Sequence, residues 1–222
     1  MTEQEWLSCE KVYRMLEFVR DRATVRQCRL FSLSCFCGYW DFSMSSISQK
    51  VFDFAETMID NEVPQDEFRQ MQELAEEVEH RLISANPICR TLSYFFLDPS
   101  VYQNGQMIYE HGYNIAETTY GFVLMMDCNP NLQMDQKRDC SLIRDIFGNP
   151  FRPVTFDPNW KTPTVTTLAQ SMYEDRDFTA MPILGDALEE AGCDNDDILQ
   201  HCRDKTGHVR GCWLVDLVLG KQ

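Results

Sequence analysis

The clearest signal for the fold is the stretch FRQMQELAEEVEHRL, residues 68–82. Its apolar side chains recur every three or four positions, and glutamates occupy the positions between them. This spacing places the apolar side chains on one face of a helix. The same interval recurs in residues 12–19, 51–59, 165–173 and 184–191. The sequence therefore predicts an all-α fold, a multi-helix bundle.

Local signals mark the ends of several predicted helices. Thr2 and Glu5 match a capping box at the start of the first helix. Thr162-Pro163 places an N-cap before a proline at the first helical position. Residues 23–40 are apolar on most sides, which predicts a buried helix. A last buried helix is expected over residues 209–219, ending at Gly220.

Residues 148–161 have a different composition, in which three prolines alternate with Phe151, Phe156 and Trp160. Proline favours extended backbone and aromatic rings favour burial, so we predict an extended connector packed across the helices. We expect residues 1–147 to form an N-terminal helical region and residues 148–222 a C-terminal helical module packed against it. A single domain is the alternative. The Asn104-Gly105 turn signal leaves open a short β-hairpin near residues 100–110.

The charge balance argues against two classes of partner. The 222 residues include 20 Lys and Arg and 35 Asp and Glu, which gives a net charge of −15. Such a field repels phosphate backbones and anionic lipid, so we expect neither nucleic-acid nor membrane binding. The N-terminus lacks the basic start and apolar run of a signal peptide, which predicts a soluble cytoplasmic protein with reduced thiols.

One segment is a candidate contact surface for a protein partner. Residues 177–202 contain seven acidic side chains and no Lys or Arg. A run of like charge is usually a solvated face. It also suits the docking of a basic partner by electrostatic steering.

The C-terminal segment holds the densest group of metal-ligating residue types, Cys193, His201, Cys202, His208 and Cys212. A tight turn through Lys205-Thr-Gly207 would bring four of them around one tetrahedral zinc ion. The predicted ligands are Cys193, Cys202, His208 and Cys212, and four protein ligands would make the site structural. Alternatively, no cofactor is present, the cysteines are small core residues, and the histidines cap helix ends or bond backbone carbonyls.

A catalytic interpretation uses the same residues, with Cys212 as the nucleophile and His208 as its base. Cys212 is followed by Trp213, Leu214 and Val215, whereas reactive thiols need an open, electropositive setting. The chain has no P-loop, nucleophile elbow, dinucleotide fingerprint or His-Glu-x-x-His motif. We therefore expect a non-enzymatic helical interaction or scaffold protein. The alternatives are a zinc-stabilised adaptor and a thiol-dependent enzyme.

Several sequence blocks are distinctive: MTEQEWLSC (1–9), LIRDIFGNPFRPV (142–154), ALEEAGC (187–193), HCR (201–203), HVRGCW (208–213) and LGK (219–221). Together they resemble a large paralogous family of uncharacterised planctomycete proteins. The resemblance covers both ends of the chain and not residues 43–134. Members often carry a run richer in cysteine and arginine where this chain has residues 31–40. The family has no established activity, so the resemblance implies a bacterial protein and leaves its function open.

Overall fold

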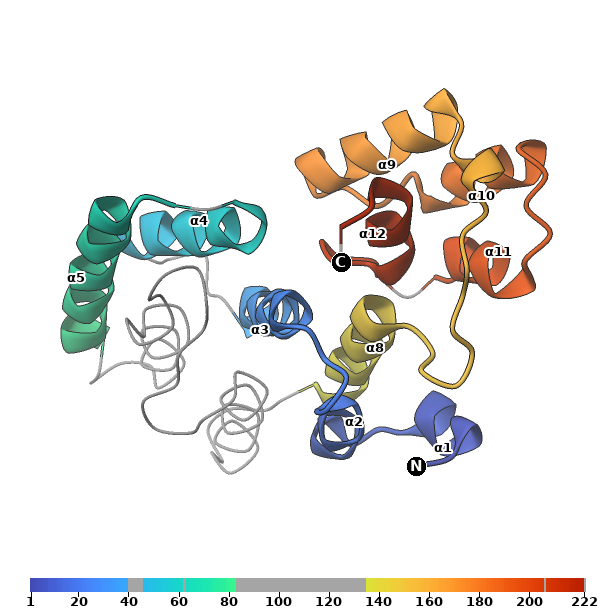
Figure 1. Cartoon of the computed structure of the whole chain (residues 1–222). Coiled ribbons are helices and arrows are strands. Elements are labelled where there is room, and N and C mark those ends of the chain that lie inside the picture. The colour runs from blue at the N-terminus through green and yellow to red at the C-terminus, as the bar shows by residue number, and fades with distance from the viewer. Residues whose placement is uncertain (40–45, 62, 83–134, 206, 222) are drawn as a thin grey trace. The chain divides into compact units, whose positions relative to one another are not determined.

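The structure is a computed structural model, and it describes residues 1–39, 46–61, 63–82, 135–205 and 207–221. Every regular element in these ranges is helical, which confirms the all-α prediction for this part of the chain (Figure 1). The predicted hairpin near residues 100–110 lies outside the described residues. The elements are α1 (Glu3–Ser8), α2 (Val12–Val19), α3 (Val25–Tyr39), α4 (Ser46–Asp60), α5 (Gln65–Leu82), α8 (Gln136–Phe147), η2 (Pro158–Trp160), α9 (Pro163–Asp175), α10 (Met181–Glu190), α11 (Asp196–Arg203) and α12 (Trp213–Leu219).

The chain divides into two compact units. Unit 1 comprises residues 1–34 and 135–222, and unit 2 comprises residues 35–134. This division differs from the expected one at residue 147, because α2 packs against α8 across a long sequence separation. The Arg144 guanidinium of α8 also donates hydrogen bonds to the backbone oxygens of Trp6 and Cys9. The N-terminal helices therefore belong to the same unit as the C-terminal ones.

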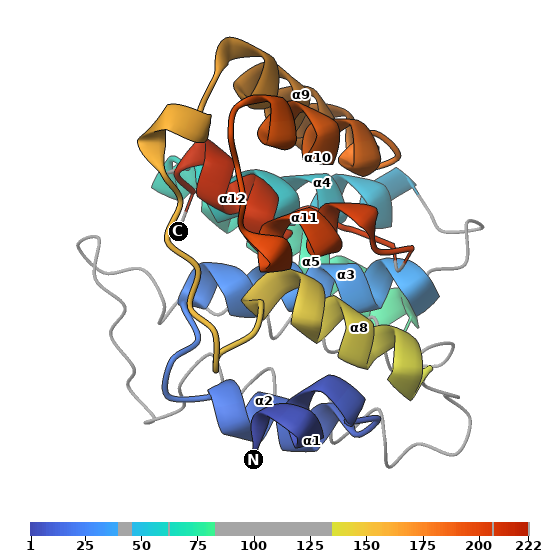
Figure 2. The same ribbon diagram turned by 90° about the vertical axis from the view of Figure 1, so that its right-hand side faces the viewer.

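In unit 1, α8 lies between the α1–α2 pair and the α11–α12 pair (Figure 2). Helices α9 to α12 surround an apolar core whose fully buried side chains include Leu184, Leu188, Ile198 and Leu214. Their inward positions recur at the helical interval that the sequence showed. Burial of such side chains contributes about 1.5–3 kcal/mol each relative to exposure.

The extended connector packs as predicted, although its rings are not fully buried. Val154, Phe156 and Trp160 lie against the core of α9–α12 and stay partly accessible. The rings of Phe156 and Trp160 meet edge to face, with centroids 5.6 Å apart. Phe151 instead stacks on Phe18 of α2 at 5.2 Å. The connector thus contacts both the N-terminal and the C-terminal helices of unit 1.

The last helix begins later than predicted, at Trp213 rather than Val209. A tight turn precedes it, in which the Cys212 N–H donates to the Val209 carbonyl at 2.9 Å. Gly211 has φ +95°, and a Cβ added there would lie 2.7 Å from Leu30 of α3. Only glycine meets both demands easily, since it lacks a Cβ and tolerates positive φ. This turn brings His208 close to the start of α12.

In unit 2, α4 and α5 pack against each other through Phe54, Met58 and Phe68. Glu67 and Asp66 occupy the first turn of α5, where the helix dipole favours negative charge. Among the described residues, no helix combines the length and the apolar character needed to cross a bilayer.

Candidate metal centre

Four side chains in unit 1 converge on one point. Asp145 comes from the last part of α8, His201 from the last turn of α11, His208 from the following loop, and Cys212 from the N-cap of α12. One ligand atom from each of them lies within 4.8 Å of all the others. The group therefore links α8 to α11 and α12.

The ligand atoms are close enough to share one partner. The Nδ1 atom of His208 lies 2.6 Å from Oδ1 of Asp145, and Nε2 of His201 lies 3.4 Å from the same oxygen. The Sγ atom of Cys212 lies 3.1 Å from Nε2 of His201 and 3.9 Å from Nδ1 of His208. The other carboxylate oxygen of Asp145 accepts the Val209 backbone N–H at 2.9 Å. That bond fixes the orientation of the carboxylate.

The site is largely buried, and His201 is its most accessible member. The side chains of Asp145 and His208 are 4% and 6% exposed, His201 is 14% exposed, and Cys212 is fully buried. Burial by itself raises the pKa of Asp145, but hydrogen bonds from His201 and His208 and their charges outweigh it and lower that pKa. Asp145 is therefore a carboxylate at neutral pH.

The pKa of the Cys212 thiol is shifted in the opposite direction, upward. Burial, followed by the negative charge of Asp145, raises its pKa well above the ordinary value. The backbone amides of Val215 and Leu214 act to lower the pKa, but they do not offset burial. Without a nearby cation, Cys212 is therefore a neutral thiol.

The structure places two of the four ligands predicted from sequence in the group and two outside it. His208 and Cys212 belong to the group, whereas Cys193 and Cys202 are not among its members. Cys202 is fully buried in α11, and a Cβ added to Gly185 of α10 would lie 2.9 Å from the Cys202 Cβ. Cys193 follows α10, and its N–H donates to the Leu188 carbonyl. Both thiols lie in the apolar core of α9–α12, as Cys212 does, but away from the two histidines.

Sequence reasoning missed Asp145 and did not select His201. Asp145 lies 63 positions before His208, so no local spacing connects the two. One signal was nevertheless present, because Asp145 falls beside Leu142 and Ile146 on the buried face of α8. A carboxylate on an apolar helix face needs a partner, since an unpaired buried charge is costly.

The burial of the thiols predicts a pattern of chemical labelling. Burial raises the pKa values of Cys140 and Cys202 to about 12, and Cys193 shifts in the same direction. Because the thiolate is the reactive form, alkylation at pH 8 should label exposed Cys37 in the folded protein and leave Cys140 and Cys202 unmodified. Mass-spectrometric peptide mapping before and after denaturation measures this. Rapid labelling of Cys202 in the folded state would contradict its burial in the core of α9–α12.

The acidic segment predicted as a partner surface lies largely on the outside of α10 and α11. Its exposed members are Asp177, Asp186, Glu189, Glu190, Asp194 and Asp196. Glu189 forms an ion pair with Arg203, and half-buried Asp197 forms one with Arg152. Part of the charge therefore has partners within the protein, and a basic protein partner stays a prediction.

The short helix that carries His201 is capped by a side chain. Asn195 is the N-cap of α11, and its side-chain oxygen accepts a hydrogen bond from the Ile198 N–H. Asp196 and Asp197 then occupy the first turn, where their charge favours the helix. His201 is thereby placed in the last turn, facing the start of α12.

Comparison with protein-family models, with curated proteins and with solved structures finds no match to this chain. The resemblance to the planctomycete family stays a prediction.

Proposed function

We propose that this protein is a non-enzymatic helical binding or scaffold protein whose unit 1 is held together by a structural zinc ion. The observation that carries the proposal is the convergence of Asp145, His201, His208 and Cys212 on one buried point. Carboxylate oxygen, imidazole nitrogen and thiolate sulfur are the ligands that zinc takes in proteins. Four protein ligands in a closed site are typical of structural zinc rather than catalytic zinc.

The spacing of the ligand atoms fits a tetrahedron around such an ion. Usual zinc bond lengths require about 3.3 Å between nitrogen and oxygen ligands and about 3.6 Å between nitrogen and sulfur. The nitrogen–oxygen distances here are 2.6 and 3.4 Å, and the nitrogen–sulfur distances are 3.1 and 3.9 Å. In each pair of distances, one value is shorter and the other longer than the separation that zinc requires. Small side-chain adjustments would therefore complete the site.

The same geometry is poorly suited to a thiol-dependent enzyme. In a catalytic triad, one nitrogen of the imidazole faces the nucleophile and the other faces the carboxylate. Here Nε2 of His201 faces both Cys212 and Asp145, and Nδ1 of His208 faces the same two side chains. A buried thiol with a raised pKa also lacks access to substrate. A shared metal ion explains this convergence better than proton transfer does.

Charge balance supports a divalent ion. The Asp145 carboxylate and a Cys212 thiolate carry two negative charges between them, which Zn²⁺ would neutralise with two neutral imidazoles. A coordinating thiol is deprotonated by the metal, so ion binding reverses the preference that burial gives to Cys212. The Val209 N–H would then donate to Oδ2 of the ligating Asp145 carboxylate and fix its orientation, as hydrogen-bond donors around metal ligands do.

Metal analysis of the full-length chain, purified without chelator, tests this function. We expect one zinc ion per chain by native mass spectrometry. Removal of the ion should lower the Tm, and excess zinc should restore it, by roughly 10 °C at a zinc concentration about a thousand times Kd. A folded, metal-free protein whose Tm does not respond to zinc would refute the proposal.

Two cysteine variants separate the observed group from the ligands that the sequence predicted. In the cobalt-substituted protein, Cys212→Ser should abolish the sulfur-to-metal charge-transfer band. Cys202→Ser should retain that band, because Cys202 lies outside the group. Loss of the band in Cys202→Ser and its retention in Cys212→Ser would favour the ligand set predicted from sequence.

A further inference from the structure

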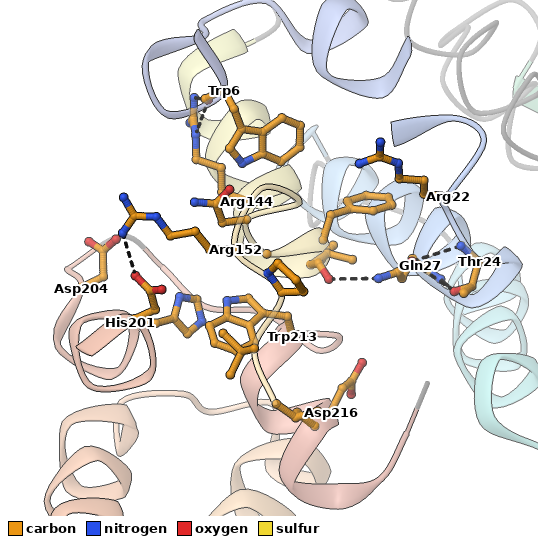
Figure 3. A pocket seen from close by; sticks show the side chains of 18 of the residues that line it. Trp6, Arg22, Thr24, Gln27, Arg144, Arg152, His201, Asp204, Trp213 and Asp216 are labelled. Atoms are coloured by element: carbon orange, nitrogen blue, oxygen red, sulfur yellow. Dashed lines mark hydrogen bonds and ion pairs between the residues drawn. The ribbon is translucent and has the colours of Figure 1, made fainter. Parts of the chain in front are cut away.

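Unit 1 contains a cavity of about 590 Å³, and His201 is the one member of the metal group that lines it (Figure 3). Phe147 and Trp213 contribute apolar surface to it, and Leu7 of α1, which also lines it, is 56% exposed. Polar side chains from the start of α3 and from the connector, such as Gln27 and Asn149, complete the lining. Binding sites for small organic molecules combine these features at this size.

The cavity is rich in cations although the protein as a whole is strongly acidic. Five basic side chains line it, against three carboxylates. The basic side chains are Arg22, Arg26, Arg144, Arg152 and Lys221. The chain as a whole has a net charge of −15, so this balance is opposite to that of the protein. An excess of cations in a cavity favours the binding of anions.

Some of these cations are neutralised by carboxylates. The Arg26 guanidinium pairs with Asp216, and it also donates to the Tyr173 hydroxyl at 2.9 Å. Arg152 pairs with Glu3 at 2.6 Å and with Asp197 at 3.4 Å. These ion pairs restrain the side chains of Arg26 and Arg152 in the lining of the cavity.

Arg144 and Arg22 are held differently, by neutral groups. Arg144 donates three hydrogen bonds to the carbonyl oxygens of Trp6 and Cys9. The Arg22 guanidinium lies over the Phe18 ring, 5.5 Å from its centroid. Within the part of the chain that the structure describes, neither forms an ion pair with a carboxylate. Their charges are therefore oriented but not neutralised. In Figure 3 the two arginines lie on either side of Trp6.

We propose that this cavity binds a small organic anion that has a flat apolar body and an oxyanion head group. The aromatic walls would contact the body, and the charges of Arg22 and Arg144 would attract the head. Guanidinium groups match carboxylate, sulfonate and phosphate oxygens in geometry as well as in charge. The ligand is recognised by charge and flatness together, so an uncharged molecule of the same shape binds less well.

Fluorescence titration of the full-length protein with anilinonaphthalene sulfonate tests the proposal. We expect saturable binding to one site, about tenfold tighter than binding of the uncharged analogue N-phenylnaphthylamine. Leu7→Glu adds a negative charge at an exposed cavity position and should weaken sulfonate binding about tenfold. Arg22→Gln should weaken it about threefold, as expected for an exposed charge.

Matched variants control for the overall charge. Gln4→Glu adds the same charge to α1, and Arg14→Gln removes one from α2, but neither residue lines the cavity. Both should bind the sulfonate within twofold of the unmodified protein, and circular dichroism checks that all four variants fold. Equal binding of the charged and uncharged probes would overturn the proposal. Equal weakening by Leu7→Glu and Gln4→Glu, or an absence of saturable binding, would also overturn it.

Discussion

Replacing Asp145 with alanine should lower the free energy of unfolding of unit 1 by about 3–5 kcal/mol and abolish zinc binding. The carboxylate is buried and accepts the Val209 N–H while facing both imidazoles. Its removal leaves these buried polar groups without their acceptor, and each such loss costs about 1–3 kcal/mol. Urea denaturation followed by tryptophan fluorescence measures the change, and metal analysis of the same variant measures the lost ion.

Asp186→Ala is the matched control, because Asp186 is an exposed aspartate on α10. We expect it to change the free energy of unfolding by less than about 0.5 kcal/mol, as surface substitutions usually do. Asp145→Asn separates charge from shape, since the amide still offers an oxygen to Val209 but carries no negative charge. It should lose zinc with a smaller loss of stability. A stability of Asp145→Ala within about 1 kcal/mol of the unmodified protein would contradict the central role of Asp145.

Trp6→Ala should destabilise unit 1 by about 3–5 kcal/mol, because truncation of a buried tryptophan leaves a large cavity. Trp6 is fully buried although it lies in the short helix α1, near the end of the chain. Its ring lies 6.1 Å from that of Phe18, and its carbonyl accepts hydrogen bonds from Arg144. The variant therefore tests whether α1 and α2 share the unit that contains α8 and the C-terminal helices.

Leu7→Ala is the control for this substitution, since Leu7 is the neighbouring residue and is largely exposed. Its cost should stay below about 1 kcal/mol, because most of the side chain has not left water. Fluorescence of Trp160, which packs against the core of α9–α12, reports unfolding in both variants. If the two substitutions cost the same, α1 is not packed as described.

Much of the helical structure was predictable because its causes are local. The Thr2–Glu5 capping box is present, with both reciprocal hydrogen bonds. The Thr162 side chain accepts from the Val165 N–H ahead of α9, and Gly220 adopts positive φ after α12. Each of these signals depends on side chains within a few positions of the helix end. Tertiary contacts have little opportunity to override them.

The candidate site was predictable only in part. His208 and Cys212 were selected because they are close in sequence, but the expected helix over residues 209–219 placed Cys212 inside a helix, whereas it is the N-cap of α12. The turn at Gly211 brings them together instead, and that turn is packed against Leu30 from a distant helix. Cys193 and Cys202 have equally suitable chemistry, and they lie in the same apolar core as Cys212. Of these three cysteines, Cys212 alone belongs to the group with Asp145, His201 and His208, a difference that residue type does not reveal.

The sequence by itself determined that the described chain forms helices, where several of them begin or end, and which faces are apolar. These properties follow from backbone propensity, capping and spacing, which act over one or two turns. Only the tertiary structure decided that the two ends of the chain share one unit, and that Asp145 meets His201, His208 and Cys212. Such contacts depend on how distant apolar faces pack against each other, and no periodicity within a single helix encodes that choice.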